Sequence, residues 1–82
     1  MNNFELEIIS PSYHATLIIE WFEVETPTGS FFVGPNHSPL ISLVKNKSRI
    51  IYKKAGNGEE VLEVPGGFLK IEHNKGLLIL DS

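Results

Sequence analysis

Apolar and polar residues alternate with a period of two along most of this chain. Phe4, Leu6 and Ile8 alternate with Glu5 and Glu7, which predicts a strand with one buried and one wet face. Similar runs lie at residues 14–25, 30–33, 40–44, 49–54, 60–64, 69–71 and 77–80. Turn signals separate the runs at intervals of about 8–12 residues, a spacing typical of all-β sandwiches and barrels. The pattern therefore predicts an all-β fold, an antiparallel β-sandwich or flattened barrel.

The second and longest run changes phase in its middle. Leu17, Ile19 and Trp21 occupy one phase, whereas Phe22 and Val24 occupy the other. A change of phase within one strand indicates a bulge or a bend that carries the strand around a corner. We therefore expect this strand to bend near Trp21, with Leu17, Ile19 and Trp21 on one face.

Length, charge and cysteine content narrow the class of protein. The chain has 82 residues and no cysteine, so we expect one domain over residues 1–82, with no disulfide or thiolate metal site. A net charge of −3 with mixed signs lacks the basic surface that duplex nucleic acid requires. Its apolar runs are far shorter than the ~20 residues of a membrane span, and the first residues do not resemble a signal peptide. We expect a cytosolic protein that inserts into no membrane.

The residue types that carry chemistry do not gather into a recognisable site. The three histidines, His14, His37 and His73, have no close metal-ligand spacing. Gly66-Gly67 lacks the Lys-Ser/Thr that follows in a phosphate-binding loop, so it predicts a turn. No Gly-x-Ser-x-Gly elbow exists, and Asp81 is the only aspartate. We expect no catalytic residue, cofactor or metal.

The stretch from Val33 to Lys45 is the least ordinary part of the sequence. It reads VGPNHSPLISLVK, with His37 held between Pro35 and Pro39. The histidine has two compatible interpretations: a ring-to-backbone hydrogen bond that caps the turn, or a contact with a partner.

Three segments together resemble the N-terminal β domain of the F-type ATP synthase ε subunit, called δ in mitochondria. The opening FELEIISP resembles the leading strand of that family. Pro35–Ile41 is close to its P-x-H-A-P-L-[LI] motif, and Pro65–Ile71 is close to its S-G-G-[FI]-L-E-V motif. The segments occur in the family's order and spacing, over essentially the whole chain. The combination is fairly specific, although either motif alone is weak.

The resemblance implies a sandwich of roughly ten short strands in the rotor of an ATP synthase. Such a subunit docks the γ subunit to the c-ring and couples rotation to ATP synthesis, with no catalytic site of its own. The resemblance also implies that the protein lies on the inner face of the cell membrane, as a peripheral part of the F1 sector. In isolation it would be a monomer or would self-associate weakly. The coupling ion, proton or sodium, stays open.

Residue roles follow by matched position only. Ser10, His37 and Ser42 match the γ-facing side, and Thr28, Gly29 and Ser30 match the loop that faces the c-ring. That loop lacks the acids of the family's usual E-G-E-[LF]-G. We also expect a short form of the subunit, without the family's C-terminal inhibitory helices.

Two questions remain open from the sequence. A lone tryptophan in a strand is usually buried, but an exposed Trp21 would be a contact for γ or for a second copy. The alternative function is a free-standing β-sandwich module that binds a protein or a ligand and is unrelated to ATP synthase.

Overall fold

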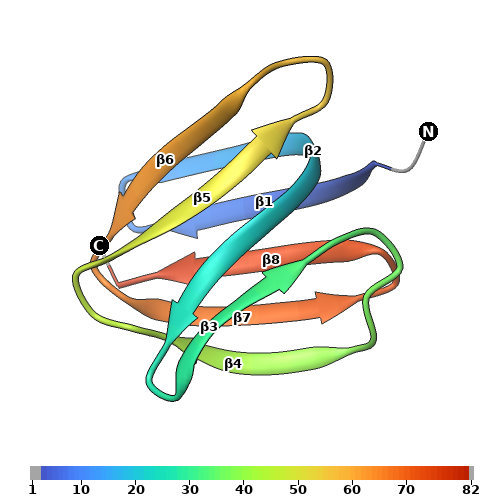
Figure 1. Cartoon of the computed structure of the whole chain (residues 1–82). Coiled ribbons are helices and arrows are strands. Elements are labelled where there is room, and N and C mark those ends of the chain that lie inside the picture. Colours follow the sequence, from blue (N-terminus) through green and yellow to red (C-terminus); the bar gives the residue numbers. More distant parts are fainter. Residues whose placement is uncertain (1–2, 82) are drawn as a thin grey trace.

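The fold consists of strands joined by short turns, as the alternating sequence predicts. The computed structural model describes residues 3–81, and Figure 1 shows their single sheet curled into a half-barrel around one core. The eight strands are β1 (Phe4–Ser10), β2 (Tyr13–Thr26), β3 (Gly29–Val33), β4 (Leu40–Val44), β5 (Ser48–Lys54), β6 (Glu59–Val64), β7 (Gly67–Glu72) and β8 (Lys75–Leu80). The all-β prediction is confirmed.

The strands follow the order β4-β7-β8-β1-β2-β5-β6, and β3 pairs with β2 as well. Every pair is antiparallel except β1 and β8, which run parallel. The count is eight rather than roughly ten, in part because the long β2 serves both halves of the sheet as one strand. Its first half pairs with β1 and its second half pairs with β3, while β5 lies along the other edge.

A bulge in β2 divides these two halves. The register with β5 shifts between Ile19 and Trp21, so Glu20 is the extra residue of the bulge. Ile19 and Phe22 are both fully buried although they are three residues apart. In an unbroken strand, that spacing would place them on opposite faces. The extra residue lets the strand bend while both halves keep an apolar side towards the core.

The predicted bend is thus confirmed, but the face predicted for Trp21 is wrong. Phe22 and Val24 lie in the same core as Ile19, and Trp21 lies on the outward side. The sequence-based assignment placed Trp21 with Leu17 and Ile19 because it counted in twos through the bulge. The true phase resumes one residue later.

The core lies inside the curl and is built from inward positions of all eight strands. Its members are Phe4, Leu6, Ile8, Ile19, Phe22, Val24, Val33, Val44, Ile50, Tyr52, Val64, Leu69, Ile71, Leu78 and Leu80. Phe4 and Phe22 pack with ring centroids 6.1 Å apart. Burying one such large side chain stabilises the fold by about 1.5–3 kcal/mol. Because both halves of the sheet pack on this one core, the positions of their outward faces relative to each other are fixed.

Candidate functional site: an apolar outward face

Large apolar side chains lie exposed on the outward side of the strands β4, β7 and β8. The register sets Leu43 opposite Phe68, and Phe68 opposite Ile79. The exposed fractions of these three residues are 53%, 54% and 43%. The row continues into β1, where the half-buried Ile9 pairs with Ile79. We call this surface the β7 face. It comprises Ile9, Ile41, Leu43, Phe68, Leu77 and Ile79.

The β7 face exists because these strands are apolar in both phases. Leu69 and Leu78 point into the core, while Phe68 and Ile79 alternate with them and point outwards. Ile41 is 73% exposed on the edge strand β4. Contiguous apolar patches on single domains usually mark interaction sites. The arrangement therefore fits the docking of a macromolecule, with apolar burial as its driving force.

Next to the β7 face, a network of paired charges joins β8, β1 and β2. Lys75 Nζ lies 3.3 Å from a carboxylate oxygen of Glu5 and 3.3 Å from one of Glu7. Glu7 Oε2 lies 2.7 Å from His14 Nε2. The hydrogen bond with His14, followed by that with Lys75, holds the pKa of Glu7 below its ordinary value. The carboxylates of Glu7 and then Glu5 raise the pKa of Lys75. These charges are paired within the domain. A partner on the β7 face would therefore be attracted mainly by the apolar row.

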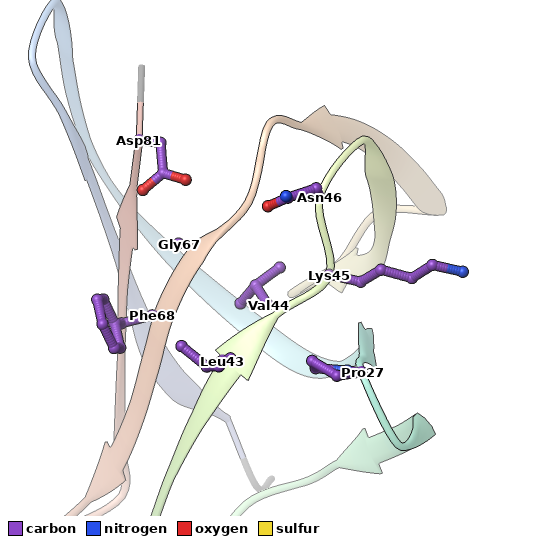
Figure 2. Close-up of a pocket in the computed structure, with 8 residues that line it drawn as sticks. All are labelled: Pro27, Leu43, Val44, Lys45, Asn46, Gly67, Phe68 and Asp81. Carbon is purple, nitrogen blue, oxygen red and sulfur yellow. The ribbon is translucent and has the colours of Figure 1, made fainter.

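A groove opens at the end of the β7 face, beside the turn between β2 and β3 (Figure 2). Its volume is about 580 Å³. Figure 2 shows Leu43 and Phe68 on one side and Pro27 of the turn on the other. Its lining residues are Pro27, Leu43, Val44, Lys45, Asn46, Gly67, Phe68 and Asp81. The groove makes the apolar row continuous with the β2–β3 turn.

Gly67 fixes the geometry at this end of the face. It has φ +152, and a Cβ on it would overlap the carbonyl oxygen of Ile79. Only glycine can therefore keep β7 this close to β8 at the level of Phe68. The predicted turn at Gly66-Gly67 thus also sets the spacing of the two strands.

The residues matched to the γ-facing side do not form one cluster. Ser10 ends β1 and is half-buried, and Ser42 lies in β4 beside the row. Ser42 is in register with the buried Leu69 rather than with Phe68, so it alternates away from the β7 face. His37 lies before β4, at the end of the sheet opposite Ser10. Ser10 and His37 thus lie at opposite ends of the sheet, and Ser42 faces away from the β7 face on the edge strand β4.

His37 has a local partner. Its Nδ1 lies 2.7 Å from the carbonyl oxygen of Ser38 and donates to it. The preceding Asn36 has φ 60, and its backbone N–H donates to Asn74 Oδ1 over 2.7 Å. Because Asn74 belongs to the β7–β8 turn, this bond ties the histidine loop to that end of the sheet. The ring-to-backbone interpretation of His37 matches this geometry, and the half-buried ring leaves the contact interpretation open.

Thr28, Gly29 and Ser30 lie at the exposed tip of the β2–β3 hairpin. Beneath them, the buried Thr26 donates through Oγ1 to the carbonyl oxygen of Gly29 over 2.7 Å. The backbone N–H of Thr28 donates to the same Oγ1 over 3.3 Å. Figure 1 shows this hairpin projecting at one extremity of the molecule. The tip is stiff and accessible.

Trp21 is half-buried on the outward side of β2. Its ring packs against that of Phe32, with centroids 5.4 Å apart. Phe32 itself is 58% exposed. The tryptophan is thus neither core nor fully free, and it stands on the second half of the sheet, away from the β7 face.

The described part of the chain shows no gathering of groups for metal chemistry. Within residues 3–81, no three side chains of His, Cys, Asp or Glu lie close enough together to hold a metal ion. Over the same range, no helix is long and apolar enough to cross a membrane.

Sequence reasoning missed the apolar row, although a signal existed. The runs 40–44 and 77–80 contain apolar residues in both phases. Such a strand must either be covered on both faces or expose one of them. The alignment of Leu43, Phe68 and Ile79 across three strands, however, depends on register, which the runs alone do not specify.

Comparisons with known proteins agree with this architecture. The family described as "ATP synthase, Delta/Epsilon chain, beta-sandwich domain" matches residues 3–82. The ATP synthase epsilon chain of Levilactobacillus brevis is 38% identical over 60 residues, which cover 72% of this chain and 41% of that protein. The sodium ion specific ATP synthase epsilon chain of Propionigenium modestum is 31% identical, covering 100% of this chain and 59% of that protein. This chain thus spans about half the length of these relatives.

A solved structure has the same fold. A chain in the central stalk and c-ring structure of the Tetrahymena thermophila mitochondrial ATP synthase superposes with a TM-score of 0.81. The superposition covers 95% of this chain and 63% of that one, at 9% sequence identity. The fold therefore persists where the sequences have diverged almost completely.

Proposed function

The chain belongs to the ATP synthase delta/epsilon family, in its β-sandwich domain, and on this premise we propose that it is a non-catalytic subunit of the rotor. In that role it attaches the γ subunit to the c-ring and couples rotation to ATP synthesis. The family assignment leaves no support for the alternative of an unrelated β module.

The observation that carries the proposal is the exposed row of Leu43, Phe68 and Ile79. A subunit that transmits torque needs a stiff body and a large complementary surface rather than a reactive group. The curled sheet supplies the stiffness, and the β7 face supplies apolar area on which a partner can exclude water. We assign γ to this face, with Ser10 and His37 at its two ends, and with Ser42 reached only around the edge strand β4.

The second contact belongs to the tip of the β2–β3 hairpin. Thr28, Gly29 and Ser30 are exposed there, and the bonds to Thr26 hold the tip rigid. Pro27 of the same turn lines the groove that meets Leu43 and Phe68. A partner on the β7 face and another at the tip would therefore share a border, which suits a body wedged between γ and the polar loops of the c-ring.

The proposal places the protein at the cytoplasmic side of the membrane as a peripheral part of the F1 sector. The ring and γ hold it there, since the proposed contacts are with proteins rather than with lipid. One relative is named as sodium ion specific, which describes that protein.

A pull-down with the cognate γ subunit tests this function directly. We expect the tagged chain to retain γ at micromolar concentration, and to raise coupled ATP synthesis when added to a complex reconstituted without it. A chain with Leu43→Ser and Phe68→Ser serves as the matched negative control. Failure of the wild-type chain to bind γ at micromolar concentration would contradict the proposal.

A further inference from the structure

The outward side of the other half of the sheet is a second candidate surface. It is formed by β3, the second half of β2, β5 and β6, and we call it the β2 face. Its apolar centre comprises Trp21, Phe32, Ile51 and Val61. The register places Phe32 opposite Glu23, Glu23 opposite Ile51, and Ile51 opposite Val61. One row thus crosses all four strands.

Two of these apolar side chains are as exposed as those of the β7 face. Phe32 is 58% exposed and Val61 is 57% exposed. The half-buried Trp21 ring packs against that of Phe32. A rigid aromatic side chain supported in this way costs little entropy when a partner covers it, and such residues provide most of the energy at interfaces.

The charges around this centre are acidic and lack ionic partners. Glu25 Oε2 accepts a hydrogen bond from the backbone N–H of Arg49 over 3.3 Å. Within residues 3–81, no side-chain nitrogen of lysine, arginine or histidine lies within 4.0 Å of the carboxylates of the following residues. These are Glu23, Glu25, Glu59 and Glu63. Lys53 is already engaged by Glu20 at 2.8 Å. Arg49 is the remaining base on this face, so negative charge predominates.

A small depression on the face has two carboxylates and one base in its lining. It has a volume of about 90 Å³ and is lined by Glu23, Glu25, Ser30, Arg49 and Ile51. Glu23 and Glu25 both lie on β2, and Glu23 is directly opposite Phe32 in the register with β3. A lysine or arginine of a partner could therefore pair with them while its apolar neighbour covers Phe32.

We propose that the β2 face binds a basic, amphipathic protein segment, distinct from the γ surface assigned to the β7 face. Aliphatic side chains of that segment cover Phe32 and Val61, and its lysines or arginines pair with the four glutamates. A second copy of this chain does not suit the face, because two such surfaces would set unpaired carboxylates against each other. The proposal concerns a partner additional to γ.

The test is a titration of the ¹⁵N-labelled chain with a synthetic helical peptide of leucine and lysine, followed by NMR. A length of about 14 residues suffices, because a helix rises ~1.5 Å per residue and the four strands span about 14 Å. We expect shifts at the Trp21 indole, Phe32 and Val61, with little change at Phe68 or Ile79. A matched peptide with glutamate in place of lysine should leave all of these signals unchanged.

Two matched variants separate this face from the other. Phe32→Thr, which keeps a good strand former, should weaken binding of the leucine-lysine peptide about tenfold. Phe68→Thr should leave that affinity unchanged, whereas it should weaken the binding of γ. Glu23→Gln combined with Glu63→Gln should weaken peptide binding and make it less sensitive to salt.

Three results would overturn the proposal. The first is a set of shifts centred on Phe68 and Ile79. The second is that the lysine and glutamate peptides bind equally well, or that neither peptide binds at millimolar concentration. The third is a concentration-dependent dimer that Phe32→Thr dissolves in sedimentation, which would assign the face to self-association. None of these results bears on γ binding, so this proposal and the rotor proposal fail separately.

Discussion

The two outward faces of this sheet expose similar side chains but arrange their charges differently. On the β7 face, Leu77 lies opposite Glu7, which is already paired with His14 and Lys75. On the β2 face, Phe32 lies beside Glu23, which has no ionic partner within residues 3–81. An apolar row with satisfied charges favours burial against another apolar surface. An apolar row with unsatisfied acids favours a cationic partner.

The bulge at Glu20 creates this difference, because it decides which residues of β2 point outwards. Deleting Glu20 should remove the bulge and leave Phe22 and Val24 facing the core, because the register with β5 then becomes continuous. Deleting Glu23 should instead turn Val24 towards water and Glu25 towards the core. We expect this second loss to exceed the roughly 5 kcal/mol on which so small a domain depends, so that variant should unfold. Circular dichroism with thermal melting measures both. Equal losses in the two deletion variants would contradict the assigned bulge.

The second-largest effect should come from Gly67, which holds the β7 face together. Gly67→Val should cost about 3 kcal/mol or more, because the side chain meets the backbone of Ile79 at a φ that suits glycine. Chemical denaturation measures the free energy of unfolding. Gly58 has open space around it, so Gly58→Ala should change stability little. Equal losses in both variants would show that the close approach of β7 to β8 is unimportant.

Trp21 provides a test on the β2 face. Because it is half-buried and pairs with Phe32, Trp21→Ala should cost only about 1–2 kcal/mol. Phe22→Ala, at a fully buried neighbour, should cost about 3–5 kcal/mol. Chemical denaturation of both variants in the same buffer gives the two losses in the free energy of unfolding for comparison. A loss for Trp21→Ala as large as that for Phe22→Ala would place the tryptophan in the core.

The smallest effect concerns the paired charges next to the β7 face. The pKa of Glu7 is lowered by His14 and Lys75, from an ordinary value of 4.5. A lowered folded-state pKa contributes stability that is present above pH 4.5 and is lost as the pH falls through the folded value. Glu7→Gln should therefore be less stable than the wild type near neutral pH and should converge with it in acid.

Thermal melting across this pH range checks the Glu7 prediction. Glu63, which has no ionic partner within residues 3–81, supplies the control. Glu63→Gln should follow the wild-type pH profile throughout. A constant difference between Glu7→Gln and the wild type down to strongly acidic pH would mean that the pairing contributes nothing to the acid sensitivity.

Much of the fold could be predicted from alternation, but pairing could not. The strands around Phe4 and Leu69 appear in the sequence because their phase is regular. The parallel pairing of β1 with β8 leaves no such trace, because alternation records which side faces the core and not which strand lies alongside. The outward direction of Trp21 was mispredicted for a related reason, since one extra residue reverses every later assignment.

The candidate site divides in the same way. The family motifs led to Ser10, His37 and Ser42, which are matched by position and whose contact roles stay predictions. The apolar row depends on two registers, β4 with β7 and β7 with β8, to bring Leu43, Phe68 and Ile79 together, and the pattern of a single strand specifies neither. The unpaired state of Glu23 likewise depends on which cations the fold places elsewhere.

The central claim is that γ binds the β7 face, and calorimetric titration of purified γ with Phe68→Thr and Phe32→Thr tests it most directly. Both residues are exposed to a similar extent, at 54% and 58%, so the two variants lose equivalent surface. We predict that Phe68→Thr weakens the affinity for γ at least about tenfold, while Phe32→Thr leaves it within error of the wild type. The reverse order of effects, or no loss in either variant, would contradict the account.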